Sequence, residues 1–270
     1  MELPLADVVE IVRDLATEQG KLAVSRWADA VPLAKKDRRD FVTAVDLEIE
    51  HNVKAVLRQR FPGHGLAGEE TADENRGAAY QWLIDPIDGT KYYAGRASLF
   101  SVSIGLLLRG EPILGVVYDA PSTQCFYAFQ GGGAFLDGHR LSGSTVDDVS
   151  RVIVNLDTAS SDRLSDRERE WFERKLVLLT RRLYRVRALG QGSLAACWLA
   201  SGALDAYLDL TGYTKPQDLA AGRVLMKEAG ARVEHVEVGV GPRRLLAAPP
   251  TVFAQLERLL LEPLTPHVHR

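Results

Sequence analysis

The sequence has little of several features that would each point to a particular class of protein. It contains only two cysteines, Cys125 and Cys197, far apart and in apolar surroundings, so no disulfide framework is expected. No apolar run approaches the roughly 20 residues that a membrane-spanning helix needs. The first residues do not resemble a signal peptide. These absences favour a cytoplasmic protein without membrane contact.

An excess of positive charge is also missing. The formal net charge is −3, from 33 lysines and arginines against 36 aspartates and glutamates. Binding to a nucleic-acid backbone requires a basic surface, so direct contact with nucleic acid is not expected. The 270 residues are enough to bury a substantial core. We expect a single unit, 1–270, made of two packed halves at about 1–145 and 146–270.

The spacing of apolar residues predicts alternating helices and strands. Three consecutive strands in the first half are separated by turn sequences, which predicts an antiparallel meander. Helices are expected at 5–27, 43–60, 162–180, 194–200, 217–229 and 249–261. Strands are expected at 66–67, 82–84, 101–108, 112–119, 124–129, 151–156, 184–187 and 204–209, with two more within 231–248.

The stretch 82–90 carries the clearest chemistry. An apolar run ends on Asp85, and Pro86 is expected to end regular pairing, which would place Asp85 and Asp88 on a turn beyond the strand. Carboxylates of this kind hold Mg²⁺ together with a substrate phosphate. Gly89 and Thr90 open a short helical segment whose free N–H groups suit a phosphate. Taken alone, an acidic surface turn explains the stretch equally well.

Other acids in the chain are individually explained by ordinary structure. Thr43 is a plausible N-cap with Asp46 in the first turn behind it, and Glu69 and Glu70 follow Gly68 as surface acids often do. The charged run that begins at Lys35 is typical of a solvated loop.

In combination these segments resemble the inositol monophosphatase family of Mg²⁺-dependent, lithium-sensitive sugar phosphatases. The resemblance runs from the first helix to Leu246-Ala-Ala-Pro-Pro, nearly the whole chain. It implies an α/β fold, a layered αβαβα sandwich with mixed and antiparallel sheets, and a homodimer. The segments that carry it are Lys35, Asp40-Phe-Val-Thr-Ala-Val-Asp46, Gly68-Glu69-Glu70, Asp85-Pro-Ile-Asp-Gly-Thr90 and Asp218-Leu-Ala-Ala-Gly222.

The resemblance also implies roles for individual residues. Glu69, Asp85 and the carbonyl of Ile87 match the ligands of a first Mg²⁺, and Asp85, Asp88 and Asp218 match those of a second. A third, more weakly bound ion would be held by Glu69 and water. Thr90 and Asp46, with Glu69 beside them, match the catalytic group that orients the attacking water. Phosphate is expected at Asp88, Gly89 and Thr90, and Lys35 and Glu70 are possible further contributors near the mouth.

The substrate side departs from the family pattern. Gln217 stands where the family usually has tryptophan, and Gly190-Gln191-Gly192-Ser193 replaces Gly-Ser/Thr-Ala-Ala. We still expect Gly190, Gln191 and Gly192 to border the sugar. Asp205 and Asp209 are expected on one face of a strand, with Asp209 as the sugar contact. If the family spacing is kept instead, Thr211 takes that place.

The expected activity is therefore hydrolysis of a small phosphomonoester by a phosphoric monoester hydrolase, because crowded carboxylates require cations and cations can activate water. Inositol 1-phosphate or a related sugar or polyol phosphate is the first candidate. Fructose 1,6-bisphosphate, histidinol phosphate and 3′-phosphoadenosine 5′-phosphate stay open. A different class of function, a non-catalytic accessory factor of RNA polymerase, is a distant alternative.

Overall fold

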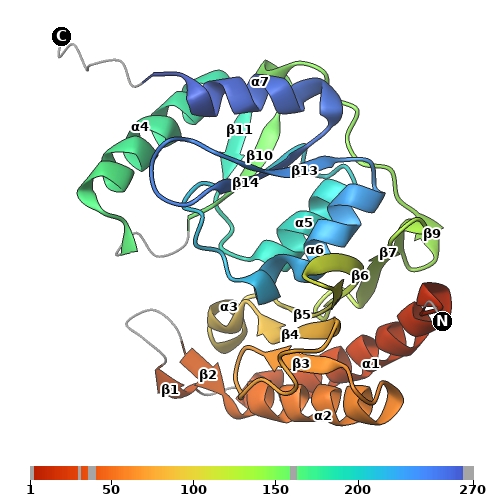
Figure 1. The fold of residues 1–270 in the computed structure, drawn as a ribbon. Helices are drawn as coiled ribbons and strands as arrows, with labels where there is room; N and C mark the ends of the chain where they lie inside the picture. Colours follow the sequence, from red (N-terminus) through yellow and green to blue (C-terminus); the bar gives the residue numbers. More distant parts are fainter. Residues whose placement is uncertain (1–2, 30–31, 36–40, 159–162, 264–270) are drawn as a thin grey trace.

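Helices and sheets alternate in five layers (Figure 1). The computed structural model describes residues 3–29, 32–35, 41–158 and 163–263. Two helices cover one face of a seven-stranded sheet, two more separate it from a five-stranded sheet, and another two cover the far face of the second sheet. The predicted αβαβα sandwich is confirmed.

The first outer layer consists of α1 (Leu5–Arg26) and α2 (Ala44–Arg60), which bury their apolar stripes on the larger sheet. In that sheet β3 and β4 are parallel and the other neighbours are antiparallel, so the predicted meander is present. Its strands, in spatial order, are β3 (Gly65–Gly68), β4 (Tyr80–Asp88), β5 (Ser101–Leu108), β6 (Glu111–Asp119), β7 (Gln124–Phe129), β8 (Gly133–Leu136) and β9 (His139–Arg140).

The middle layer is formed by α5 (Gly192–Ala200) and α6 (Pro216–Glu228), which pack against each other and against both sheets. Glycine permits the close approach of α6 to the larger sheet. A Cβ atom on Gly115 of β6 would overlap the backbone carbonyl of Ala221. This contact fixes the height of α6 above the sheet, and thereby the position of its first turn.

The second sheet has the order β11 (Arg185–Arg187), β10 (Ile153–Asp157), β12 (Ala206–Asp209), β14 (Arg244–Ala248) and β13 (Arg232–Val236). β10 is parallel to both of its neighbours, and β14 is antiparallel to both of its own. The outer helices are α4 (Asp166–Arg182) and α7 (Pro250–Leu261). Short elements complete the chain: η1 (Trp27–Asp29), the antiparallel pair β1 (Pro32–Lys35) and β2 (Phe41–Thr43), α3 (Thr90–Ala94) and η2 (Val149–Arg151).

The structure corrects the predicted path of β4. The strand does not end at Ile84 but continues through Pro86 to Asp88, with a register shift between Asp85 and Asp88 against β5. A bulge accommodates the missing N–H of proline while the chain stays within the sheet. Asp85 and Asp88 therefore lie on a buried strand end and not on a turn beyond it.

Several other boundaries differ from prediction by a few residues, and two of them affect the placement of acids. α4 starts at Asp166 and not at 162, because Ser165 and Glu168 form a capping box that fixes its first turn. β12 starts at Ala206, so Asp205 is outside the strand; it accepts hydrogen bonds from the Ser144 hydroxyl and the Ile153 N–H. Asp205 thus joins a loop to β10 and does not share a strand face with Asp209. No helix in the described ranges has the length and apolar character that crossing a bilayer requires.

The close packing of α6 leads to a prediction. Gly115→Ala should lower the free energy of unfolding by about 1–3 kcal/mol, because the added methyl group overlaps the backbone of α6. Thermal or urea unfolding measures the change. Gly77→Ala is the control, since a Cβ there has no atom within 4 Å among the described residues. Equal stability of the two variants would show that the sheet and helix are not tightly apposed.

Candidate active site

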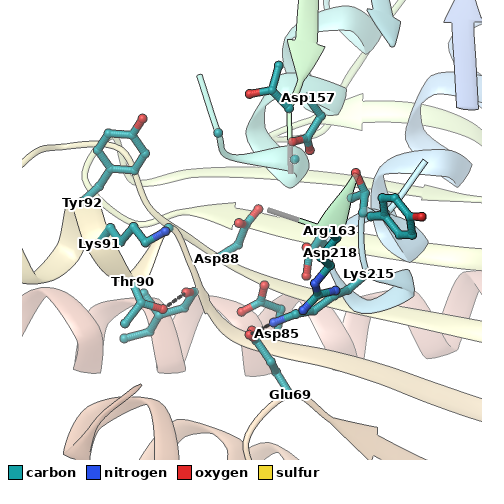
Figure 2. A pocket seen from close by; sticks show the side chains of 17 residues that line it. Glu69, Asp85, Asp88, Thr90, Lys91, Tyr92, Asp157, Arg163, Lys215 and Asp218 are labelled. Carbon is teal, nitrogen blue, oxygen red and sulfur yellow. Dashed lines mark hydrogen bonds and ion pairs between the residues drawn. The ribbon is translucent and has the colours of Figure 1, made fainter. Parts of the chain in front are cut away.

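A pocket of about 570 Å³ lies where the ends of β3 and β4 meet the first turns of α3, α5 and α6 (Figure 2). Both predicted halves contribute to it. Its lining residues are Glu69, Asp85, Ile87, Asp88, Gly89, Thr90, Lys91 and Tyr92 from the first half, and Asp157, Thr158, Arg163, Gly190, Gly192, Tyr213, Thr214, Lys215 and Asp218 from the second.

Three carboxylates converge in this pocket. Glu69 follows β3, Asp85 lies in β4, and Asp218 is in the first turn of α6; oxygens from all three lie within 4.8 Å of one another. Asp85 is only 2% exposed, and its Oδ1 has no hydrogen-bond partner among the described residues. A buried acceptor without a donor is costly unless a cation or proton satisfies it. The group is therefore suited to a hard cation.

Asp88 lines the same pocket as these three carboxylates, and one of its oxygens already has a hydrogen-bond donor. One of its oxygens accepts a hydrogen bond of 2.8 Å from the N–H of Ser193, in the first turn of α5. Burial raises the pKa of Asp88 to about 7, against the opposing effect of this N–H. Burial, followed by the charges of Asp88 and Glu69, raises the pKa of Asp218 to about 8. Burial and the same crowding raise the pKa of Asp85 well above its usual value.

Thr90 lines the pocket, and the fully buried Asp46 lies directly behind it. The Thr90 hydroxyl lies 2.9 Å from the carbonyl oxygen of Ile87 and 3.3 Å from Oδ1 of Asp46. Asp46 is held by the N-terminus of α2, where its other oxygen accepts hydrogen bonds from the N–H and hydroxyl of Thr43. Gly89 supplies the left-handed φ of +93° that turns the chain from β4 into α3. Sequence-predicted residues 46, 69, 85, 87–90, 190, 192 and 218 are thus brought together.

The Gln191 side chain forms hydrogen bonds within the fold. Its side-chain oxygen caps α5 by accepting from the N–H of Leu194, and its nitrogen donates to the Ser101 hydroxyl. The side chain is 2% exposed and joins α5 to the larger sheet. Unlike Gly190 and Gly192, Gln191 is not among the lining residues. The predicted contact of residues 190–192 with the sugar stays a prediction, while the Gln191 side chain is bonded within the fold.

Asp209 and Thr211 are also turned away from the pocket lining. The Asp209 carboxylate accepts hydrogen bonds from the N–H groups of Thr211, Gly212 and Thr214 and from the Thr211 hydroxyl. It therefore holds the loop that leads to Lys215 and Asp218. Glu70 does not line the pocket either, and the side chain of Lys35 lies outside the described residues.

The structure adds lining residues that the sequence analysis missed. Asp157 ends β10, where its carboxylate accepts a 2.9 Å hydrogen bond from the Tyr207 hydroxyl, and burial raises its pKa. A ligand site at the carboxyl end of a parallel strand is a common arrangement, so the acid ending the run Ile-Val-Asn-Leu-Asp was a usable signal. Arg163 and Lys215 had no such signal. Arg163 belongs to a loop of mixed charge, and Lys215 is a single charged residue between Asp209 and Asp218.

Glu50 was also missed, although it positions the first predicted metal ligand. Its buried carboxylate accepts hydrogen bonds of 2.7 and 3.0 Å from the N–H groups of Glu70 and Thr71, and Lys54 pairs with it at 3.0 Å. A Cβ on Gly68 would overlap this carboxylate. An i,i+4 acid–base pair on the apolar face of α2 was the available signal.

Layered sheets and helices around a pocket of converging carboxylates define an α/β protein with a cluster of acidic residues that could hold a metal ion. The chain matches the model of the inositol monophosphatase family over residues 5–269, so it belongs to that family. This is a family of phosphatases that act on small phosphorylated substrates.

Named relatives extend the comparison. The chain is 33% identical to a fructose-1,6-bisphosphatase/inositol-1-monophosphatase of Aquifex aeolicus over 201 residues, 73% of each chain. It is 33% identical to human inositol monophosphatase 2 over 242 residues, 88% of this chain and 79% of the relative. Nus factor SuhB of Escherichia coli is 32% identical over 225 residues, 81% of each chain.

Solved structures agree. An inositol monophosphatase from Anabaena is similar with a TM-score of 0.81 and 28% identity, covering 97% of this chain and 98% of the other. SuhB of Mycobacterium tuberculosis is similar with a TM-score of 0.80 and 29% identity, covering 98% and 100%.

The crowded carboxylates predict how pH affects the metal-free protein. Since folding raises the pKa of Asp88 and Asp218 to about 7 and about 8, the folded form holds protons that the unfolded chain releases near pH 4. The stabilisation of the folded state by these bound protons is fully present below about pH 4. It is lost as the pH rises through the folded-state pKa values of about 7 and about 8. In EDTA, the melting temperature should be lower at about pH 9 than at about pH 6.

Asp218→Asn should reduce this pH difference, because the amide carries no charge at either pH. Added Mg²⁺ should reduce it in the wild type by stabilising the ionised form. Scanning calorimetry measures both effects. A melting temperature that rises from about pH 6 to about pH 9 in EDTA would contradict the arrangement of carboxylates.

Proposed function

We propose that this protein catalyses the Mg²⁺-dependent hydrolysis of a small phosphomonoester and releases inorganic phosphate. The observation that carries the proposal is the convergence of Glu69, Asp85 and Asp218 in one pocket, with a buried Asp85 oxygen that has no hydrogen-bond partner among the described residues. Membership of a phosphatase family supports it independently.

The donor set fits magnesium. Mg²⁺ takes oxygen ligands and is held by carboxylates together with a substrate phosphate. Glu69, Asp85 and Asp218 would hold it, joined by Asp88 and the carbonyl of Ile87, which line the same pocket. Two or three ions per site are proposed. When bound, such ions lower the pKa of a coordinated water and stabilise negative charge on phosphate oxygens.

The protein's own groups would orient the reactants. Asp46 is buried behind the pocket lining, 3.3 Å from the Thr90 hydroxyl, so its expected part in orienting the water would act through Thr90. The Thr90 hydroxyl lies between Asp46 and the Ile87 carbonyl. Gly89 and Thr90 line the pocket with their backbone and would contact the phosphate. The Glu50 carboxylate, by fixing the N–H groups after Glu69, limits the movement of that ligand.

We propose a sugar or polyol phosphate such as inositol 1-phosphate as substrate, in keeping with the names of the relatives. Fructose 1,6-bisphosphate is the alternative that the Aquifex relative's name favours. Histidinol phosphate and 3′-phosphoadenosine 5′-phosphate stay as further candidates. A cytoplasmic homodimer is proposed from the family resemblance.

The name Nus factor, carried by the E. coli relative, favours a second candidate function as an accessory factor of RNA polymerase. Such a role does not require four carboxylates and Thr90 in one pocket, and this chain has all of them. We therefore propose hydrolysis as the principal activity.

The first test is phosphate release from a panel of sugar phosphates with and without Mg²⁺. Asp85→Asn should lower kcat/KM by more than about 100-fold while the protein stays folded, because the ion loses a ligand shared within the cluster. Asp119→Asn is the matched control, a buried carboxylate outside the pocket. Near-normal turnover of Asp85→Asn at saturating Mg²⁺ would refute the proposed function.

Asp209 allows a second test of how the pocket is built. Since its carboxylate holds the loop before α6, Asp209→Asn should lower kcat/KM by about tenfold for a polyol phosphate and an aryl phosphate alike. It should also lower the melting temperature. A loss confined to KM for the polyol phosphate would instead make Asp209 a sugar contact.

A further inference from the structure

Lys215 forms an ion pair that the proposed function leaves unused. Its Nζ lies 2.7 Å from Oε1 of Glu69 (Figure 2). The Lys215 side chain is 42% exposed and that of Glu69 is 12% exposed, so the pair stands at the border between pocket and solvent. The ammonium can therefore leave the carboxylate without crossing packed protein.

The backbone of Lys215 is anchored while its side chain reaches across the pocket. Lys215 is the N-cap of α6, Pro216 takes the first helical position, and the Lys215 carbonyl accepts from the N–H of Asp218. Proline fixes the chain direction at this position. One helical turn thus supplies the cluster with the carboxylate of Asp218 and with a positive charge paired to Glu69.

The ammonium and a divalent cation compete for the same carboxylate. Burial and the carboxylates of Asp88 and Glu69 raise the pKa of Asp218, and the charge of Lys215 acts in the opposite direction, so the ammonium acts on the whole cluster. Two cations at one carboxylate oxygen repel each other strongly in a partly buried site. A metal ion that binds Glu69 must therefore displace the ammonium or bind more weakly beside it.

We propose that the Lys215 ammonium pairs with the Glu69 carboxylate until a divalent cation takes its place. The released ammonium then binds the substrate phosphate. The proposal rests on the proposed function for the identity of the metal ligands. Lysine is a common phosphate partner, and Lys215 lines the same pocket as Gly89 and Thr90. Phosphate, by holding the ammonium away from Glu69, then raises the affinity for the metal, and the converse follows by linkage.

Isothermal titration calorimetry of the metal-free full-length protein with Mg²⁺ tests this, with and without inorganic phosphate. In the wild type, phosphate should increase the affinity for Mg²⁺. In the absence of phosphate, Lys215→Met should bind Mg²⁺ about 3- to 10-fold more tightly than the wild type. Breaking a solvent-accessible ion pair weakens wild-type Mg²⁺ binding by up to about fivefold, and repulsion between the ammonium and Mg²⁺ adds to this. Its phosphate-induced increase should be smaller than in the wild type. Lys215→Arg should keep the wild-type pattern.

Lys91→Met is the matched control, because it removes a positive charge that lines the same pocket from α3. Its Mg²⁺ affinity should stay within about twofold of wild type. Lys215→Gln, a second neutral variant, repeats the test if the methionine variant is unstable.

Unchanged or weaker Mg²⁺ binding by both neutral variants would overturn the role of Lys215 while leaving the proposed function intact. A phosphate effect of equal size in wild type and neutral variants would overturn the proposed transfer to phosphate. A wild-type protein that binds no Mg²⁺ would overturn both this inference and the proposed function.

Discussion

The gathering of several carboxylates, most of them buried, in one pocket is the constraint on which the candidate site depends. Asp85, Asp88 and Asp218 are buried or nearly so, and Glu69 faces them. Desolvated carboxylates repel one another unless protons, hydrogen bonds or cations compensate them. Among the described residues, the Ser193 N–H on Asp88 and the Lys215 ammonium on Glu69 provide partial compensation. Burial, and after it the charge of neighbouring acids, raises the pKa values of Asp85, Asp88 and Asp218. The same charge makes the pocket suitable for a hard cation.

Much of this arrangement was predictable from the sequence, for two different reasons. Periodic apolar residues are a local signal, so the helices α1, α2 and α7 and the meander of β5 to β7 were placed almost to the residue. The layered architecture and the converging acids came from the family motifs, because the local patterns around Asp46 or Glu69 have ordinary structural explanations. Confirmation of the family over 5–269 supports that use of the motifs.

The surroundings of several buried polar side chains could not be predicted from local patterns. Gln191 caps α5 and bonds to Ser101 of β5, 90 positions away, and Asp209 holds the 211–214 loop, so their contacts with the sugar stay predictions. Both are buried, and a buried polar group takes whichever donors or acceptors the tertiary fold offers. The same reasoning covers Lys215, whose contact with Glu69 spans 146 positions. Pro86 was wrongly predicted to end regular strand pairing. The strand continues past it because a bulge between Asp85 and Asp88 accommodates the proline.

The division of the pocket between the two halves of the chain has a consequence for the order of folding. Glu69 follows β3, and Asp85 and Asp88 lie in β4, while Asp218 and Lys215 belong to the start of α6, much later in the sequence. During synthesis the first half leaves the ribosome before the second, so its acids remain hydrated and little perturbed until α6 docks. The electrostatic cost of the cluster therefore falls on the docking of α6. Divalent cations present in the surrounding medium would favour that step and act as folding partners before any substrate is met.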